Sequence, residues 1–301
     1  MSEYKSINDL IKSSHSFAKT SYGTGIKEFS KLSIEFSPGQ VVLVGSRPAV
    51  GRTMFLLFLY HYFWKSNGLP QAYISNEECE EKLLHKLIAT TTGITINNII
   101  EKFGSPEFPY SDIYLSKDNL LMFSQSSWEE LREEIMWLIK EKGIKFFYLD
   151  KIQGLQTDET FRNRDQQLGF IAREIKKIAV QNEVVFFLGS SLSRSVERRE
   201  GKHPYLSDIR ESGALEDFCD TIFLIHRPEV YGITEDECGN SLLGIAEILV
   251  KKNKHGRTGE LTFRFNNQIP RFEEIKENKQ LNFTDRFNNQ TGNNTDNDTP
   301  F

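Results

Sequence analysis

One short segment, a strand followed by a tight turn and a helix, constrains the fold of this chain more than any other segment does. The apolar run Val41–Val44 comes first, Gly51 follows, and the apolar stretch Met54–Leu57 indicates a helix. A turn of this kind leaves backbone N–H groups at the helix N-terminus unpaired and directed at one point, where a phosphate can accept them. The segment therefore predicts either a phosphate-binding turn or an ordinary Gly-containing turn between a strand and a helix.

The turn departs from the phosphate-binding pattern G-x-x-x-x-G-K-[ST] at two positions. In that pattern the Lys reaches the outer phosphates of a nucleotide and the hydroxyl holds Mg²⁺. Ser46 stands at the first Gly and Arg52 at the Lys, whereas Gly51 and Thr53 match. If the turn binds a nucleotide, we expect these residues to form its cradle: Ser46, Arg47, Pro48, Ala49, Val50, Gly51, Arg52 and Thr53.

The composition is that of a globular chain with one large core. Its 301 residues are 38% apolar, and no stretch has the apolar length that a membrane span needs. The polar N-terminus does not read as a secretory signal, so we expect a cytoplasmic protein with no membrane partner. The three cysteines lie far apart and match no metal or redox spacing. A net charge of −5 argues against wholesale binding to nucleic acid but leaves room for a local basic strip.

Apolar runs and helical patterns alternate through the body of the chain, which we expect to extend over residues 21–274. Strands are expected at 41–44, 72–75, 120–123, 144–149 and 184–188, and helices at 53–64, 78–89, 128–140 and 168–180. This alternation predicts an α/β fold with a mainly parallel sheet and helices on both faces. Three later runs, at 222–225, 244–250 and 261–265, indicate an extension of the sheet or a terminal β-hairpin.

The two ends of the chain differ from this body. Residues 1–20 are polar with one weakly amphipathic stretch, and we interpret them as an arm or a short linker helix. Residues 275–301 are rich in Asn, Thr and Asp and poor in apolar residues. Such a composition cannot offset the entropy lost on ordering, so we expect a disordered polar tail.

One helix has clear boundary signals, and the strand after it positions an acid. Ser127 with Glu130 three residues later is typical of a capping box, and Gly143 ends the helix. The apolar strand that follows leads to Asp150, which should lie at the carboxyl edge of the sheet. Open parallel sheets bind their ligands at that edge.

Thr53 and Glu77 are expected at the same edge as Asp150. Thr53 and Asp150 are the expected Mg²⁺ ligands, and Glu77 follows the strand at 72–75. A carboxylate there could orient the water that attacks a terminal phosphate. The alternative is that Glu77 is only an acid near a helix N-terminus, because three more glutamates adjoin it.

Two basic segments offer contacts to phosphates. The segment 194–203 follows the end of a strand, and its cations suit the backbone of single-stranded DNA. The expected DNA contacts are Arg194, Arg198, Arg199 and Lys202. A solvated charged loop is the alternative, because two glutamates interleave with these cations. The second segment, 251–257, suits a phosphate in a neighbouring subunit or a turn that lysines keep soluble.

Several of these segments resemble DnaB-type replicative helicases. Gly45–Thr53 resembles the P-loop of that family, which shares the Arg-Pro pair and lacks the first Gly. Tyr73–Glu77 resembles the strand that ends in the family's catalytic glutamate, and Tyr148–Gln153 resembles the segment around its Walker B acid, as does Asn163–Gln166 with the helix that follows. The resemblance covers about residues 20–274 and implies a RecA-like motor domain.

The most specific match lies further along the chain. Ser193–Arg198 and Leu206–Glu216 are close to family sequence almost without a break, which disfavours a recombinase-type or clock-type relative of the fold. Lys252–Gly259 resembles the arm that carries the family's trans-acting lysine and arginine finger. The matching part begins near residue 20, so no counterpart of the family's N-terminal helical domain is expected in this sequence.

The resemblance implies an ATP-dependent DNA helicase of DNA replication, with ATP and Mg²⁺ as cofactors. It implies single-stranded DNA as a partner and a hexameric ring of copies of this chain. The catalytic residues that it implies are Glu77, Asp150, Arg52, Lys252 and Lys254.

Three positions depart from the family pattern at catalytic places. Arg52 replaces the P-loop lysine, Lys254 replaces the arginine finger, and Ser191 replaces a glutamine that senses nucleotide and DNA. Because a planar guanidinium cannot take the place of a point charge without a shift, hydrolysis should be slow. Two functions therefore stay open: a motor with slow turnover, or a non-catalytic RecA-fold regulator or loader that binds a full-length replicative helicase.

The last residues, Asp296–Phe301, resemble the acidic tip of bacterial single-stranded DNA-binding proteins. A free carboxylate beside Phe suits a pocket with an apolar floor and a basic rim, so the tip could bind a replication partner. An arbitrary disordered end is the alternative, because so short a match arises easily by chance.

Overall fold

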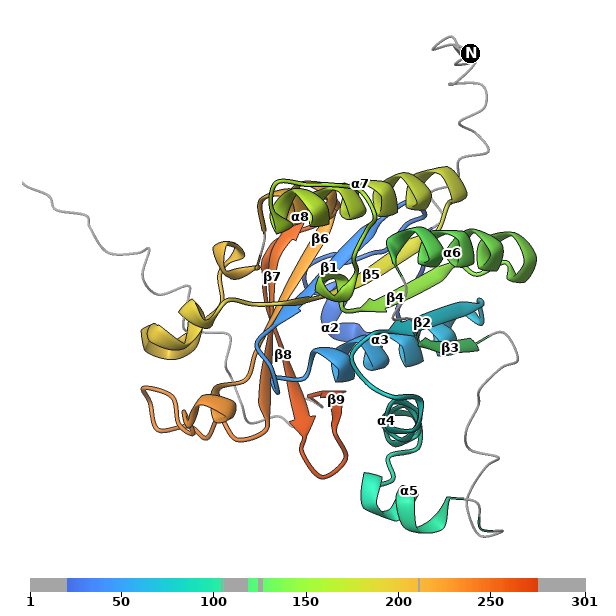
Figure 1. Cartoon of the computed structure of the whole chain (residues 1–301). Coiled ribbons are helices and arrows are strands. Elements are labelled where there is room, and N and C mark those ends of the chain that lie inside the picture. The colour runs from blue at the N-terminus through green and yellow to red at the C-terminus, as the bar shows by residue number, and fades with distance from the viewer. Residues whose placement is uncertain (1–20, 104, 106–118, 124–126, 211, 276–301) are drawn as a thin grey trace, which may run out of the picture.

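The chain folds around one twisted sheet with helices on both faces (Figure 1). The structure is a computed structural model that describes residues 21–103, 105, 119–123, 127–210 and 212–275. Within these residues, nine strands lie in the order β3-β2-β4-β5-β1-β6-β7-β8-β9. Their bounds are β1 Val41–Ser46, β2 Gln71–Ser75, β3 Asn119–Phe123, β4 Phe146–Asp150, β5 Val185–Ser191, β6 Thr221–His226, β7 Ile245–Asn253, β8 Gly259–Asn266 and β9 Arg271–Glu274.

The sheet is parallel from β3 to β6 and antiparallel from β6 to β9. Parallel strands inside the sheet, such as β1 and β4, are buried on both faces, which is why they read as continuous apolar runs in the sequence. The predicted α/β fold with a mainly parallel sheet and an added C-terminal β region is confirmed.

Helices cover the two faces of the sheet in separate groups. The helices are α2 Lys27–Ser30, α3 Arg52–Asn67, α4 Glu80–Thr92, α5 Ile96–Lys102, α6 Trp128–Lys142, α7 Arg164–Asn182 and α8 Ser212–Phe218. Figure 1 shows α6, α7 and α8 on one face and α2 and α3 on the other. The described residues also contain short 3₁₀ turns, namely η2 Ile152–Gly154, η3 Arg194–Arg198, η4 Glu200–Lys202, η5 Leu206–Asp208 and η6 Pro228–Tyr231.

Each face of the sheet has its own apolar core. Along β1, Val42 and Val44 face the core that α3 covers, whereas Val41 and Leu43 face the core beneath α6 and α7. On the α3 face, Phe55 packs edge to face on Phe272 of β9, with ring centroids 5.1 Å apart. The antiparallel strands are thus joined to α3, and the turn before α3 is held between them and β1.

Most predicted elements are present with small shifts at their ends. Ser127 accepts a hydrogen bond from the Glu130 N–H at 3.5 Å, and Gly143 caps α6 with a φ of 64°, as the signals predicted. The helix expected to start at residue 78 begins at Glu80, and the strand expected to start at 144 begins at Phe146. The short helices α2, α5 and α8 and the strand β9 are not among the predicted elements.

The predicted arm over residues 1–20 and almost all of the predicted tail over 275–301 lie outside the described residues. Within the described part of the chain, no helix combines the length and the apolar character that a membrane crossing requires.

Candidate functional site

The turn between β1 and α3 lies at the carboxyl edge of the parallel strands. Gly51 precedes α3 with a φ of 112°, in the left-handed region that favours glycine. A Cβ at Gly51 would make ordinary van der Waals contact with a ring carbon of Phe265 at 3.4 Å, so the backbone conformation and not the space is what favours glycine here. The N-terminus of α3 therefore opens at this edge, with its free N–H groups beside the end of β1.

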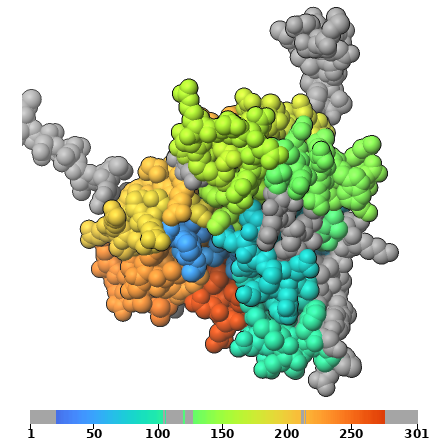
Figure 2. All heavy atoms as spheres, in the orientation of Figure 1, coloured from blue at the N-terminus to red at the C-terminus, as the bar shows by residue number. Residues whose placement is uncertain are grey.

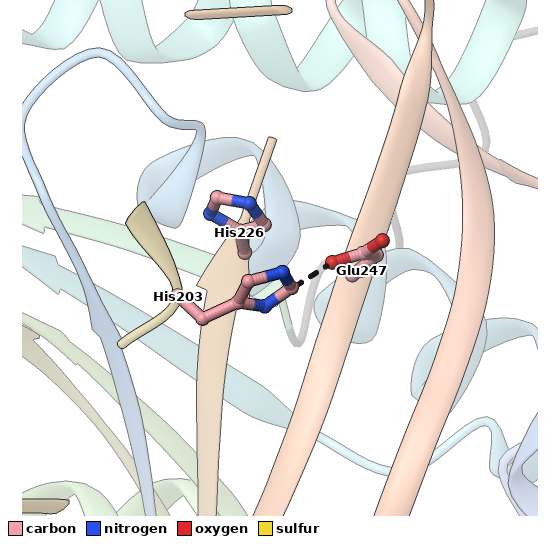
Figure 3. Close-up of side chains that lie close together, drawn as sticks. All are labelled: His203, His226 and Glu247. Atoms are coloured by element: carbon pink, nitrogen blue, oxygen red, sulfur yellow. Dashed lines mark ion pairs between the residues drawn. The ribbon is translucent and has the colours of Figure 1, made fainter. Parts of the chain in front are cut away.

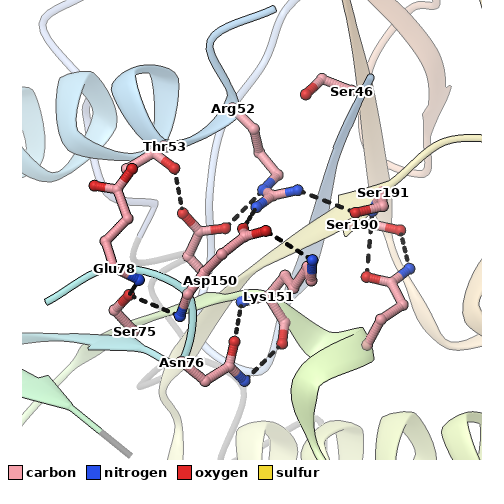
Figure 4. Close-up of polar contacts among 12 residues, drawn as sticks. Ser46, Arg52, Thr53, Ser75, Asn76, Glu78, Asp150, Lys151, Ser190 and Ser191 are labelled. Carbon is pink, nitrogen blue, oxygen red and sulfur yellow. Dashed lines mark hydrogen bonds and ion pairs between the residues drawn. The ribbon is translucent and has the colours of Figure 1, made fainter. Parts of the chain in front are cut away.

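Asp150 is the centre of a buried polar cluster at the same edge (Figure 4). The hydroxyl of Thr53 donates to Asp150 Oδ2 at 2.6 Å, and the hydroxyl of Tyr73 donates to the same oxygen at 3.1 Å. Arg52 Nε donates to the other oxygen, Oδ1, at 2.6 Å. The predicted meeting of Thr53 and Asp150 therefore occurs, and the two side chains that could hold Mg²⁺ are in direct contact.

Glu77 joins this cluster through cations from two elements. Arg52 Nη2 donates to one of its carboxylate oxygens, and Lys151 Nζ donates to the other at 2.7 Å. Partial burial alone would raise the pKa of Glu77, but the bonds from Lys151 and Arg52 outweigh burial and lower it. Glu77 also precedes α4, which begins at Glu80, so it is not simply an acid in the first turn of that helix.

Arg52 points at the acids of the site and is almost fully enclosed. Its side chain is only 9% exposed, and its third nitrogen, Nη1, donates to Ser191 Oγ at 3.3 Å. A Cβ at Gly189 would lie 2.7 Å from Asp150 Oδ1 and 3.0 Å from Arg52 Nε, so the glycine leaves room for this ion pair. Burial would lower the pKa of Arg52, but Asp150 and then Glu77 outweigh burial and raise it, so the guanidinium stays charged.

Arg52, Thr53 and Glu77 of this cluster line a cleft of about 960 Å³, whereas Asp150 is buried behind them and does not line it. Figure 2 shows the blue atoms of the turn exposed where cyan, yellow and orange-red parts of the chain meet. The cationic side chains that line the cleft are Arg47, Arg52, Lys82, Lys86, Lys151, Arg194, Arg210 and Arg227. At one end, the Arg227 guanidinium stacks on the ring of Phe265 at 3.7 Å from its centroid. So cationic a cleft beside a helix N-terminus suits a ligand with several phosphates.

Several of these lining residues were not predicted as site residues. Lys82 and Lys86 lie four apart on α4 and so share one face of it, a spacing that the sequence does contain. Lys151 directly follows the predicted acid Asp150. No local signal indicates Phe265, because only the antiparallel pairing of β8 and β9 brings it beside the turn.

The basic segment 194–203 is folded into η3 and η4 and lies next to the turn. Arg194 and Arg198 are exposed, and Arg194 lines the cleft. Arg199 instead bonds the buried Asp208, with Nη2 donating to Oδ1 at 2.6 Å, and Lys202 Nζ donates to the Glu197 carbonyl at 2.5 Å. The four predicted DNA contacts thus divide into two outward cations and two that also hold the segment together.

The segment is also tied to the turn itself. Arg47 Nε donates to Glu197 Oε1 at 2.8 Å, and its Nη1 donates to the Leu192 carbonyl at 2.8 Å. Arg47 therefore connects the proposed phosphate cradle with the segment expected to contact DNA. A displacement of the turn would therefore also move η3.

Lys252 and Lys254 lie at the opposite edge of the sheet. Asn253 is paired with Thr221 at the amino end of β6, whereas Thr53 lies beyond the carboxyl end of β1. Lys252 Nζ donates to the Glu216 carbonyl at 2.5 Å, and Lys254 Nζ donates to Asp220 Oδ1 at 2.9 Å. These two lysines cannot reach the cleft of their own chain, so any role at a nucleotide requires a neighbouring copy.

The family of the chain follows from a comparison over nearly all of this fold. The family model described as the DnaB-like helicase C terminal domain matches residues 22–274. The chain belongs to this family. The resemblance noted from the P-loop, the two acidic segments and residues 193–216 is therefore confirmed, as is the RecA-like fold.

Curated relatives agree with this assignment. The replicative DNA helicase DnaB of Haemophilus influenzae is 26% identical over 93% of this chain. A probable plasmid replicative DNA helicase of Chlamydia psittaci is 27% identical over 84% of it. The chain spans 60% of the first relative and 56% of the second, so it corresponds to a part of each.

Two solved structures share the fold. One, described as an ATPase domain, has a TM-score of 0.76 and 24% identity and covers 91% of this chain and 100% of its own. The other is a DnaB-like replicative helicase described with its interactions with primase. It has a TM-score of 0.71 and 23% identity and covers 91% of this chain and 69% of its own.

Proposed function

We propose that this chain is a DnaB-like motor domain that binds Mg²⁺·ATP and single-stranded DNA in replication and hydrolyses ATP slowly. The geometry that supports this proposal is the contact of Thr53 with Asp150 at 2.6 Å, beside Glu77 and at the N-terminus of α3. In this proposal, residues 21–274 form a cytoplasmic motor domain, residues 1–20 an arm, and residues 275–301 a polar tail whose tip is free to bind a replication partner.

The phosphates of ATP would lie over the turn 46–53. Backbone N–H groups of the turn and of α3 would donate to the phosphate oxygens, and the cations of the cleft would neutralise them. Thr53 and Asp150 would hold Mg²⁺, because hydroxyl and carboxylate oxygens are ligands that this ion prefers. Held by these two side chains, the ion would supply positive charge against the negative charge of the phosphates.

Arg52 would limit the rate of this reaction. Both oxygens of Asp150 already accept hydrogen bonds, and Arg52 bonds Glu77 as well. For Mg²⁺ to reach Asp150 and for Glu77 to orient a water, Arg52 would have to leave one or both acids. A carboxylate that is neutralised by Arg52 and Lys151 is also a weak base, which again predicts slow hydrolysis.

A neighbouring copy would supply the remaining cations. Lys252 and Lys254 lie at the edge of the sheet away from their own cleft, so a ring would bring them to the cleft of the next subunit. Lys254 would have to exchange its bond with Asp220 for one with the γ-phosphate. As a point charge it neutralises a phosphate without the bidentate geometry of an arginine finger.

The DNA contact would be made by the segment 194–203. Arg194 and Arg198 are exposed on it, and Arg47 links it to the phosphate turn. Phosphate contacts of this kind position a strand without reading its sequence. The Arg47 link would let nucleotide and DNA binding influence each other.

The proposal is tested with size-fractionated protein. Calorimetric titration with ATP and Mg²⁺ should give one site per chain, and steady-state hydrolysis should be slow and stimulated by single-stranded DNA. A chain that binds no nucleotide in either the monomer or the ring fraction would overturn the proposal.

One observation favours a second function, a non-catalytic regulator or loader of a full-length replicative helicase. Arg52 forms ion pairs with both Glu77 and Asp150, as a fixed internal cation would, and so takes the place that a metal ion or a water would need at these acids. Mg²⁺·ATP binding without any turnover, together with co-elution with a full-length replicative helicase, would support this function over the motor.

A further inference from the structure

A second polar cluster, made of residues that do not line the cleft, lies where three elements meet (Figure 3). His226 ends β6 and is paired in register with Glu247 of β7. His203 follows η4 and reaches the same point from the basic segment. The cluster therefore joins the segment 194–203 to the antiparallel part of the sheet.

The three side chains are close enough to share one ion. The rings of His203 and His226 have centroids 4.3 Å apart, and His203 Nδ1 lies 3.7 Å from Glu247 Oε2. One ligand atom from each residue lies within 4.8 Å of the other two. Ligands of one tetrahedral Zn²⁺ sit at about 2.0–2.2 Å from the metal, so small side-chain rotations would close the site.

The polar atoms of this cluster have unmet hydrogen-bonding capacity. Both ring nitrogens of His226 are buried without a hydrogen-bond partner, and so is Glu247 Oε2. His226 is only 1% exposed. A buried imidazole with two unsatisfied nitrogens is costly, and an ion that its lone pair can bind is one way to remove that cost.

We propose that His203, His226 and Glu247 form a binding site for a divalent transition metal, best matched by Zn²⁺. Two imidazoles and one carboxylate are a ligand set typical of Zn²⁺ and unlike the all-oxygen sets of Mg²⁺ or Ca²⁺. His203 is 44% exposed at its side chain, so solvent can reach the cluster, and three protein ligands would leave a fourth position for water. The bound metal fastens η4 to β6 and β7.

The test uses the full chain without a histidine tag, after removal of metals with a chelator. Titration with Co²⁺, a spectroscopic substitute for Zn²⁺, should give the visible absorption of a tetrahedral nitrogen and oxygen site, saturating at one ion per chain. Zn²⁺ should displace the Co²⁺. A thiolate-to-cobalt band would instead indicate Cys79 or Cys238, which are exposed, and would contradict the proposal.

Variants separate this site from adventitious binding. His203→Gln should weaken Zn²⁺ affinity at least about 10-fold while leaving the circular dichroism unchanged, because His203 is half-buried and outside the core. His226→Gln should also weaken Zn²⁺ affinity, and His255→Gln, in an exposed turn, is the matched control and should bind Zn²⁺ like wild type. Zn²⁺ affinity that is equal in wild type and His203→Gln would overturn the site.

The fastening of η4 has its own readout. Zn²⁺ should slow tryptic cleavage after Lys202 in wild type and leave the rate unchanged in His203→Gln. Equal cleavage of metal-free and Zn²⁺-loaded wild type would show that the metal does not hold this segment.

Discussion

Replacing Arg52 by Lys should strengthen the binding of Mg²⁺·ATP. The Arg52 guanidinium spans Asp150 through Nε and Glu77 through Nη2, and both bonds join full charges. Asp150 is buried, whereas the Glu77 side chain is 39% exposed. The ammonium of a lysine has one nitrogen and keeps at most one of these bonds at full strength. Compared with wild type, the variant therefore has one charged bond fewer to break before Mg²⁺ can bind Asp150.

The size of the effect follows from that lost bond. A hydrogen bond to a charged group contributes about 1.5–3 kcal/mol, which corresponds to a factor of about 10 to 150 in an equilibrium constant. The Kd for ATP in the presence of Mg²⁺ should fall by a factor in that range. The free energy of unfolding of the empty protein should fall by a comparable amount, because Asp150 or Glu77 loses a partner.

Calorimetric titration with ATP, with Mg²⁺ and with EDTA, provides the measurement. The gain in affinity should be much smaller in EDTA, because no metal then competes with Arg52 for Asp150. Arg173→Lys, on the exposed side of α7, is the matched control and should change neither affinity. An Arg52→Lys variant that binds Mg²⁺·ATP no more tightly than wild type, or gains equally in EDTA, would refute this view of Arg52.

Two further predictions concern the DNA segment and the His–Glu cluster. Arg194→Ala with Arg198→Ala should weaken binding to single-stranded DNA and flatten the plot of log affinity against log salt by about 0.7 per lost phosphate contact; an unchanged slope would make the segment a solvated surface. Burial, and then the charge of Glu260, raise the pKa of Glu247 to about 7. The folded chain therefore keeps a proton that the unfolded chain releases, so the free energy of unfolding falls as the pH rises from about 4.5 through 7. Glu247→Gln, measured by urea unfolding in EDTA, should therefore be more stable than wild type by up to about 3 kcal/mol at pH 8 and by under about 1 kcal/mol at pH 5. The opposite order of the two pH values would contradict the raised pKa.

The sequence predicts the parallel part of the fold well, for a physical reason. Strands buried on both faces, such as β1 and β4, must be apolar throughout, and the helix before β4 has strong signals such as the cap at Ser127. By contrast, α5 has only seven residues and β9 four, so neither is long enough for a periodic pattern to stand out.

The residues of the site also divide into those whose position the sequence predicts and those whose position it does not. The position of Asp150 is predictable because it ends an apolar strand, but the direction of Arg52 is not, because a guanidinium at that place can face phosphates or acids. Arg199 was expected to contact DNA, and its bond with Asp208 depends on how η3 and η5 fold against each other. The cluster of His203, His226 and Glu247 has no local spacing, since the register of β6 with β7 creates it.

The most direct test of the proposed function is the rate of ATP hydrolysis by an exchanged pair of residues. Arg52→Lys with Lys254→Arg restores the family's cations at both positions, so the double variant should hydrolyse ATP faster than the sum of the two single variants predicts, because both groups would act on one phosphate. Glu77→Gln on that background should remove the gain, since the attacking water would lose its orienting carboxylate. A double variant as inactive as either single variant, in ring fractions with single-stranded DNA, would contradict a slowed motor and leave the non-catalytic function.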